Sequence, residues 1–283
     1  MRCFRLFCVI AVFLVFVILM ANIDNVNAKK IIKQQDKTSI LKNILQKSRE
    51  YHGYSAWTKK KSVWSANSRK QFDINGNEVM QVSEIQCYLL KPQLKIFTET
   101  LERLPLTVKI FDGIKFNVWH NGKLETDDNV LRLARFQSFW DFVLSNFPFI
   151  ALNPKNNYQS LGQSRIKGVV YEKIRVVVNR EVFPETPHNW YLIYINSVTG
   201  QIQKAYGEIA ALEFSGMVQM IEFESYFETE GIKIPQKLSV FLVSGEELKV
   251  GPFLEEITRE NISFKRSIPD DLFDSNFYKF LQK

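Results

Sequence analysis

The feature that most constrains the fold is an alternation of apolar and polar residues with a period of two, which recurs along most of the chain. The clearest case spans residues 106–119, where two alternating segments flank Asp112-Gly113. Successive side chains of a strand point to opposite faces, and Asp-Gly between two such segments predicts a hairpin with a type I′ turn. The expected apolar face consists of Val108, Ile110, Ile114, Phe116 and Val118.

Comparable segments predict further antiparallel strands before and after this hairpin. They cover residues 57–101 with a turn at 73–77, and then residues 168–178, 190–195, 201–209, 212–227, 232–243 and 257–264. The expected turns between strands include Asn121-Gly122, Thr199-Gly200, Glu230-Gly231 and Ser244-Gly245. The fold class is therefore mainly β (α+β), with helices as a minor component.

Two segments depart from this alternation and have helical spacing instead. Ser39 is a plausible cap for an amphipathic helix that Gly53 ends, and Thr126-Asp127-Asp128 is typical of a capped helix start. We expect the second helix to end at Pro148. Its aromatic side chains spread beyond a narrow stripe, which predicts either a helix packed on two sides or a lid that contacts a ligand and gates access to it.

The N-terminus has the layout of a secretory signal peptide over residues 1–28. Arg2 and Arg5 precede an apolar run, and Val26-Asn27-Ala28 supplies small residues for cleavage near Ala28. The alternative is an uncleaved membrane anchor, because residues 6–23 form an uncharged run at the lower edge of spanning length. We expect a periplasmic or secreted protein, without an N-terminal lipid anchor, since no cysteine directly follows the run.

Cleavage would leave residues 29–283 as a single domain. The net charge would fall from +7 to +6, because the segment contains two basic residues and one acidic residue. Only Cys87 would remain, so no intramolecular disulfide could form. Cys87 lies in a strand-like segment, where a buried, inert thiol is the expected state.

Three short motifs carry a family resemblance. They are Phe223-Glu224-Ser225-Tyr226 with Gly231 and Pro235, then His52-Gly53 with Trp57, and residues 193–200 ending in Thr199-Gly200. These segments, in the order helix, strands, helix, strands, resemble the LolA/LppX-like envelope proteins (outer-membrane lipoprotein-sorting-like). They are also similar to an uncharacterised secreted family of that fold.

The resemblance implies an unclosed antiparallel β-barrel that wraps the N-terminal helix and the central helical insertion. It also implies non-covalent binding of a lipid, an acyl chain or a lipoprotein segment in an apolar cavity, by a carrier without a cofactor. Two alternatives stay open. One is a protein-interaction or sensing module with a small, filled interior, and the other is a hydrolase whose site residues converge only in the fold.

The sequence offers little support for catalysis or for a metal site. His52, His120 and His188 are isolated, and no nucleophile elbow, phosphate-binding loop or dinucleotide motif is present. Four glutamates near the long strands are better explained by a charged, solvent-facing sheet edge than by paired catalytic carboxylates: Glu222, Glu224, Glu228 and Glu230. We therefore expect no enzyme and no metal.

The basic residues form two short runs, residues 29–33 and 59–61, for which a solvated surface is the default interpretation. Nucleic acid is an improbable partner for an exported protein, so the more specific expectation is transient contact with an anionic membrane surface.

The aromatic content is high, with 23 Phe, 10 Tyr and 5 Trp in the whole chain. An inner barrel face that holds an apolar ligand would use such residues. The candidates for this cavity lining are Trp64, Phe97, Phe116, Trp119, Trp140, Phe214, Phe223 and Tyr226.

Overall fold

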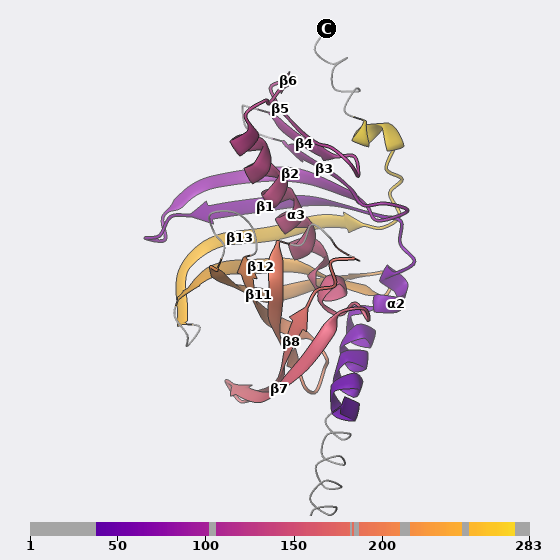
Figure 1. Ribbon diagram of the computed structural model, residues 1–283, viewed down its shortest axis with the longest axis vertical. Helices are drawn as coiled ribbons and strands as arrows, with labels where there is room; N and C mark the ends of the chain where they lie inside the picture. The colour runs from indigo at the N-terminus through magenta and orange to yellow at the C-terminus, as the bar shows by residue number, and fades with distance from the viewer. Residues whose placement is uncertain are drawn as a thin grey trace, which may run out of the picture. The chain divides into compact units, whose positions relative to one another are not determined.

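The computed structural model describes residues 38–101, 106–181, 183, 187–209, 216–244 and 249–274 (Figure 1). The signal segment, Phe214 and the expected turn at Ser244-Gly245 lie wholly or partly outside these residues. The chain divides into two compact units, Met1–Ile44 and Leu45–Lys283. In the first unit, residues 38–44 are helical. All that follows concerns the second unit, which begins with helical residues 45–52.

Thirteen strands form one antiparallel sheet in the described part of the second unit. The first six are β1 (Ser62–Phe72), β2 (Glu78–Leu89), β3 (Lys95–Thr100), β4 (Thr107–Phe111), β5 (Phe116–His120) and β6 (Lys123–Leu124). The other seven are β7 (Asn157–Ile166), β8 (Val169–Val177), β9 (His188–Asn196), β10 (Ile202–Ile209), β11 (Val218–Thr229), β12 (Ile232–Ser244) and β13 (Lys249–Ser263). The helical elements are α2 (Tyr54–Trp57), α3 (Asp128–Ala151) and the 3₁₀ helix η2 (Asp270–Phe273).

The strand order is β6-β5-β4-β3-β2-β1-β13-β12-β11-β10-β9-β8-β7, so each half of the chain forms a meander and β1 joins the halves through β13. Strands β6 and β7 end the sheet without pairing to each other. The expected unclosed antiparallel barrel is confirmed. In Figure 1, α3 lies along one face of the sheet.

The turns show how far local rules determine the hairpins. Glu230 and Gly231 have φ values of 53° and 71°, and they join Thr229 directly to its partner Ile232, as a type I′ turn requires. The hairpin at Asp112 is also confirmed, but the predicted type I′ turn is wrong. Asp112 N–H donates to the carbonyl of Lys115 and its carboxylate accepts from two amides, so the turn is longer and Ile114 is exposed instead of lying on the apolar face.

Helix α3 begins as expected but does not end at Pro148. Asp127 caps it, because its side chain accepts from the amides of Asn129 and Val130. Pro148 lies inside the helix, and the backbone leaves helical geometry at Asn146 (φ −115°, ψ 18°) before it resumes. A proline inside a helix removes one backbone hydrogen bond and displaces the preceding turn, so the consequence here is a kink. Residues 138–151 are all buried, which favours the packed-helix alternative for this half.

Both faces of the β1–β5 region are covered. On one face, α3 contacts Arg69, Tyr88 and Phe111. On the other, Phe273 of η2, with Ile268 and Leu272, closes an apolar cluster of Cys87, Phe97, Val108, Ile110 and Trp119. The expected buried state of Cys87 is confirmed, and burial raises the pKa of its thiol to about 12.

The sequence interpretation was wrong on two further points. The glutamates at 222, 224 and 228 belong to β11, which pairs with β10 and β12 and is therefore an interior strand, not an edge. Glu224 and Glu228 are exposed on the solvent-facing side of the sheet. The last strand also starts earlier than expected, at Lys249, because β12 extends its pairing with β13 to that residue.

Candidate functional site

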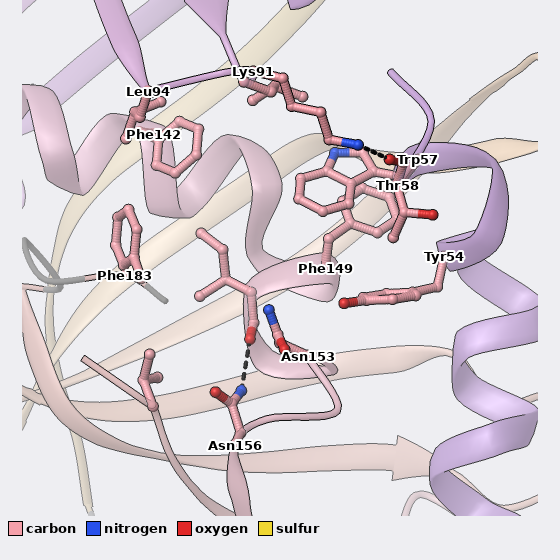
Figure 2. Close-up of a pocket in the computed structure, with 13 residues that line it drawn as sticks. Tyr54, Trp57, Thr58, Lys91, Leu94, Phe142, Phe149, Asn153, Asn156 and Phe183 are labelled. Atoms are coloured by element: carbon pink, nitrogen blue, oxygen red, sulfur yellow. Dashed lines mark hydrogen bonds between the residues drawn. The ribbon is translucent and has the colours of Figure 1, made fainter. Parts of the chain in front are cut away.

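An apolar pocket lies where α2 faces the C-terminal end of α3 (Figure 2). Its volume is about 300 Å³. Four parts of the chain supply its walls: α2, the β2–β3 loop, α3 with the loop that follows it, and the residues after β8. The lining side chains are Tyr54, Trp57, Thr58, Leu90, Lys91, Leu94, Phe142, Phe149, Ile150, Asn153, Asn156, Val178 and Phe183.

Stacked aromatic rings form the wall between α2 and α3. Trp57 lies parallel to Phe149, with centroids 4.7 Å apart and 9° between the planes. The Nε1 of Trp57 donates to Oδ1 of Asn146 at 3.3 Å, so α2 is bonded to the residue at the kink of α3. On the opposite wall, Phe142 and Phe183 lie 5.3 Å apart. This arrangement gives two aromatic walls with room between them.

The pocket has a few polar side chains among its apolar lining. The Nζ of Lys91 donates to the carbonyl of Thr58 (Figure 2). The Nδ2 of Asn156 donates to the carbonyl of Ile150 at 2.8 Å. Asn153 accepts from the amide of Lys155 at 3.0 Å, which leaves its Nδ2 toward the pocket. An apolar interior with a few placed polar groups is the usual composition of a small-molecule site.

The pocket wall contributed by α3 is held at the end of the helix. The last carbonyls of a helix have no partner within it. Here the Nε of Arg49 donates to the carbonyl of Leu152 at 2.9 Å, and the hydroxyl of Tyr158 lies 3.1 Å from the carbonyl of Ala151. The positive charge of Arg49 also complements the negative end of the helix dipole. The C-terminal end of α3 is thus fixed independently of any ligand.

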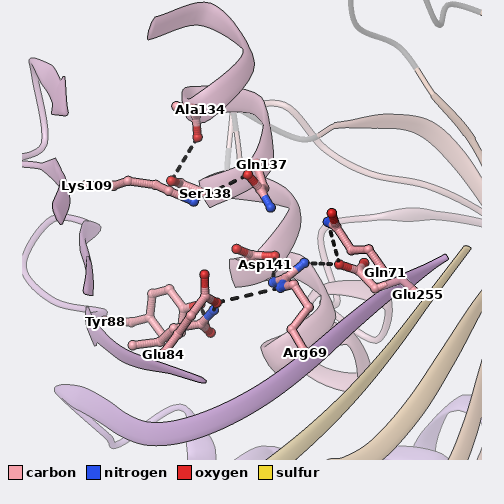
Figure 3. Close-up of polar contacts among 11 residues, drawn as sticks. Arg69, Gln71, Glu84, Tyr88, Lys109, Ala134, Gln137, Ser138, Asp141 and Glu255 are labelled. Atoms are coloured by element: carbon pink, nitrogen blue, oxygen red, sulfur yellow. Dashed lines mark hydrogen bonds and ion pairs between the residues drawn. The ribbon is translucent and has the colours of Figure 1, made fainter. Parts of the chain in front are cut away.

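A buried charged cluster lies beside the pocket, on the same face of the sheet (Figure 3). At its centre Arg69 of β1 forms ion pairs with Asp141 of α3 and Glu255 of β13. Its Nε lies 3.6 Å from Oε2 of Glu84 on β2. Arg69 is only 2% exposed, so one guanidinium connects three strands to the middle of α3 away from water.

Burial and neighbouring charges shift the pKa values of the cluster residues in different directions. Burial alone would lower the pKa of Arg69, but its three carboxylate neighbours together raise it, so the guanidinium stays charged. Burial raises the pKa of Asp141 to about 6 in spite of Arg69. Burial lowers the pKa of Arg259, which donates to the carbonyl of Pro235 at 2.8 Å, to about 10. The charge of Asp141 therefore changes near pH 6.

A ring contact separates this cluster from the pocket. Tyr88 donates to Gln86 at 2.7 Å, and Gln86 donates to Glu84 at 3.2 Å, so Tyr88 belongs to the polar network. Its ring lies 5.2 Å from that of Phe142, which lines the pocket. The boundary between charged and apolar surroundings therefore falls within one turn of α3, between Asp141 and Phe142.

Two of the three motifs of the resemblance contact each other directly, and both contact Ile202 of β10. Gly53 has φ 71°, and a Cβ there would lie 1.8 Å from the carbonyl oxygen of Gly231, so only glycine fits. His52 accepts from the amide of Ile202 at 3.2 Å, and Tyr226 donates to the carbonyl of the same residue at 2.7 Å. These contacts join the helical residues before α2 to β10 and to the β11–β12 turn, which places α2 at the pocket.

The predicted lining residues lie elsewhere. Trp64, Phe97 and Trp119 belong to the apolar cluster under η2. Trp140 contacts His188, Phe223 contacts Phe147, and Tyr226 contacts His52. Phe116 is half-buried opposite Phe111, and Phe214 lies outside the described residues. None of the seven described residues lines the pocket of Figure 2, so their contact with a ligand stays a prediction.

The sequence reasoning missed the residues that do line the pocket. Most of them, including Leu90, Leu94 and Asn153, lie in loops or at element ends, where no periodic pattern marks a face. Trp57 belongs to a motif of the resemblance, but that motif does not mark it as a pocket residue. One available signal was the pair Leu89-Leu90 directly before Lys91 and Pro92, because apolar residues that continue into a turn are not explained by the strand.

The histidines do not share a site. Burial lowers the pKa values of His52 and His188 to about 3, so both are neutral at pH 7. His120 lies by Thr107 and Glu125. Across the described residues, no group of three His, Cys, Asp or Glu side chains is arranged to hold a metal. In the same part of the chain, no helix has the length and apolar character needed to cross a membrane.

Comparison with known proteins gives similarity in structure only. No protein-family model matches the chain, and no curated protein does. A LolA superfamily protein from Nitrosomonas europaea is 12% identical, with a TM-score of 0.52 over 83% of this chain and 98% of that protein. A domain assigned to outer membrane lipoprotein sorting, from Vibrio parahaemolyticus, is 11% identical, with a TM-score of 0.51 over 83% and 97%. The LolA-like fold that the motifs predict is confirmed.

Proposed function

We propose that this chain is an exported carrier that binds the alkyl chain of a lipid or an acylated molecule in the pocket between α2 and α3, without covalent chemistry. The observation that carries the proposal is the pocket itself, with mostly apolar walls from four parts of the chain and few polar groups. The LolA-like fold supports it, since one solved relative in structure is assigned to lipoprotein sorting. The signal-peptide pattern of residues 1–28 supports export.

The binding energy would come from removing alkyl surface from water, at about 25 cal/mol per Å² buried. The aromatic walls supply this environment without rearrangement, because Trp57 and Phe149 already stack on each other and Asn146 fixes the indole. A pocket that exists before binding loses little conformational entropy when a ligand enters.

The test is to purify the protein expressed from the full-length gene, extract it with organic solvent and identify bound lipid by mass spectrometry. In parallel, a fluorescent fatty-acid probe is titrated into the delipidated protein. We expect co-purified lipid and saturable probe binding. Absence of both would overturn the proposal.

Matched variants locate the binding site. Leu94→Trp fills the pocket and should weaken probe binding about tenfold, the loss of roughly 1.4 kcal/mol. Ile114→Trp, on the exposed β4–β5 turn, adds the same side chain at a residue 79% exposed and should leave binding unchanged. Equal binding by both variants and the wild type would place the ligand elsewhere.

An interaction or sensing module is the second candidate, and one observation favours it. The space between the middle of α3 and the sheet is occupied by the charged cluster around Arg69, which fits the filled interior that this alternative predicts. A protein that carries no lipid and binds no probe, while folded, would favour this module over the carrier.

A further inference from the structure

The rim of the pocket differs from its walls in one chemical respect. Among the thirteen lining residues there is one charged side chain, Lys91, and no carboxylate. Within the described residues, no Asp or Glu oxygen comes within 4.0 Å of the Lys91 ammonium. Its only hydrogen bond there goes to the carbonyl of Thr58, so an ammonium with three donors still has two to offer.

Two further donors face the same space. The hydroxyl of Tyr54 makes no hydrogen bond within the described residues, and in Figure 2 it points toward Asn153. Burial raises the pKa of Tyr54, so its hydroxyl keeps its proton at neutral pH. The Oδ1 of Asn153 is occupied by the amide of Lys155, which turns the Nδ2 donor into the pocket. The rim therefore offers donors from two sides, to a ligand that must supply acceptors.

The residues around Tyr54 also favour a ligand that carries negative charge. A shallower groove that shares Tyr54 with the pocket is lined by Arg49, Lys59 and one acid, Glu50. Glu50 accepts from Gln46 at 2.7 Å. The groove thus carries two positive charges against one negative charge, and the electrostatic potential at the rim favours an anion.

We propose that the pocket takes the single alkyl chain of an amphiphile with an anionic head group, and that Lys91, Tyr54 and Asn153 hold this head at the rim. The volume of about 300 Å³ lies at the lower end of the roughly 300–1,000 Å³ usual for small-molecule pockets, which favours one chain over several. This inference rests on the proposed function and specifies its ligand. The head is an oxyanion, either the carboxylate of a fatty acid or the phosphate of a single-chain phospholipid.

The experiment compares ligands that share one chain and differ in the head. Oleate, oleoyl lysophosphatidic acid and neutral oleyl alcohol each displace the fluorescent probe from the delipidated protein at pH 8. We expect at least one acid to bind about tenfold more tightly than the alcohol, since a charge-assisted hydrogen bond contributes roughly that factor. The acid that binds more tightly shows whether the head group is a carboxylate or a phosphate.

Variants then assign the preference to the rim. Lys91→Gln should lower the ratio of acid affinity to alcohol affinity from about ten to between about one and two, and Tyr54→Phe should produce about half of that reduction. Lys115→Gln removes another exposed lysine, at the β4–β5 turn, and should leave the ratio at its wild-type value.

Three outcomes would overturn the inference while the carrier function survives. These are equal binding of acid and alcohol by the wild type, an unchanged ratio in Lys91→Gln, and an equal loss in Lys115→Gln, which would indicate a general effect of net charge. Failure of all three ligands to displace the probe, or of the probe to bind, would instead count against the proposed function.

Discussion

The middle of α3 and its C-terminal end pack against the same face of one sheet in opposite ways. In the middle, Asp141 pairs with Arg69 in a buried cluster that also includes Glu84 and Glu255. At the end, Phe142 and Phe149 leave a pocket of about 300 Å³. The two regions meet between adjacent residues, where Phe142 contacts Tyr88.

The two regions therefore have different roles. The charged cluster holds the helix in place, whereas the pocket can accommodate a ligand. Ion pairs and hydrogen bonds depend on direction, so the contacts of Arg69 hold α3 at one position along the sheet. Apolar contacts depend mainly on area, so an alkyl chain can replace one set of them with another. A helix held in its middle by charge can therefore border an unfilled pocket at its end without shifting to close it.

The strongest test of the charged region is Arg69→Met. The substitution keeps much of the side-chain volume but leaves three carboxylates buried without their shared partner. Breaking a buried ion pair on one side costs about 3–5 kcal/mol of unfolding free energy, and we expect a loss of this size in urea denaturation.

The control is Lys70→Met, one residue further along β1. Lys70 pairs with Glu78 at 3.3 Å, and both side chains are more than a third exposed, so a loss of no more than about 1 kcal/mol is expected. Similar losses in the two variants would show that the cluster does not hold α3 more firmly than a surface pair.

The second test uses pH. Because burial raises the pKa of Asp141 from 3.8 to about 6, the folded protein holds this proton between pH 6 and 4 while the unfolded chain does not. The contribution of Asp141 to stability therefore grows as the pH falls from 7 to 4, by up to about 1.4 kcal/mol per pH unit. Asp141→Asn should lack this gain.

The measurement is the unfolding free energy of wild type minus that of Asp141→Asn at several pH values. The difference should increase on acidification. His52 and His188, whose pKa values are lowered, destabilise both proteins below pH 6.5 and cancel in it. A flat difference would mean that Arg69 keeps the carboxylate of Asp141 charged throughout.

The contrast between the two regions also explains what the sequence could reveal. Local signals predicted the hairpin at Glu230-Gly231 and the capped helix start at Thr126-Asp127-Asp128, because these depend on neighbours in the chain. The alternation in β1 and β2 predicts two faces, but it does not show which element covers each of them. Trp64 and Phe97, two of the residues predicted to line a cavity, pack under η2, an element more than 170 residues away.

The charged cluster and the pocket were both beyond a local reading. Arg69 lies 72 residues from Asp141 and 186 from Glu255 along the chain, so the pairing of β1 with β13 and the packing of α3 on the sheet are both needed to bring them together. Rules for strand faces place apolar side chains inside, and they gave no reason to place Arg69 there. The pocket depends on loop residues such as Leu94 and Asn153, whose positions follow from the packing of α2 on α3.

The smallest expected effect falls at the kink between the two regions. Trp57→Phe removes the donor to Asn146 but retains a ring to stack on Phe149, so we expect a loss of about 1 kcal/mol in urea denaturation and a change in probe affinity below twofold. Trp190→Phe, which removes an indole donor to Glu208 in β10, is the matched control for stability. If Trp57→Phe instead abolished probe binding while keeping most of its stability, the single bond to Asn146 would be what holds the pocket open. The apolar region would then depend on a directional contact just as the charged region does.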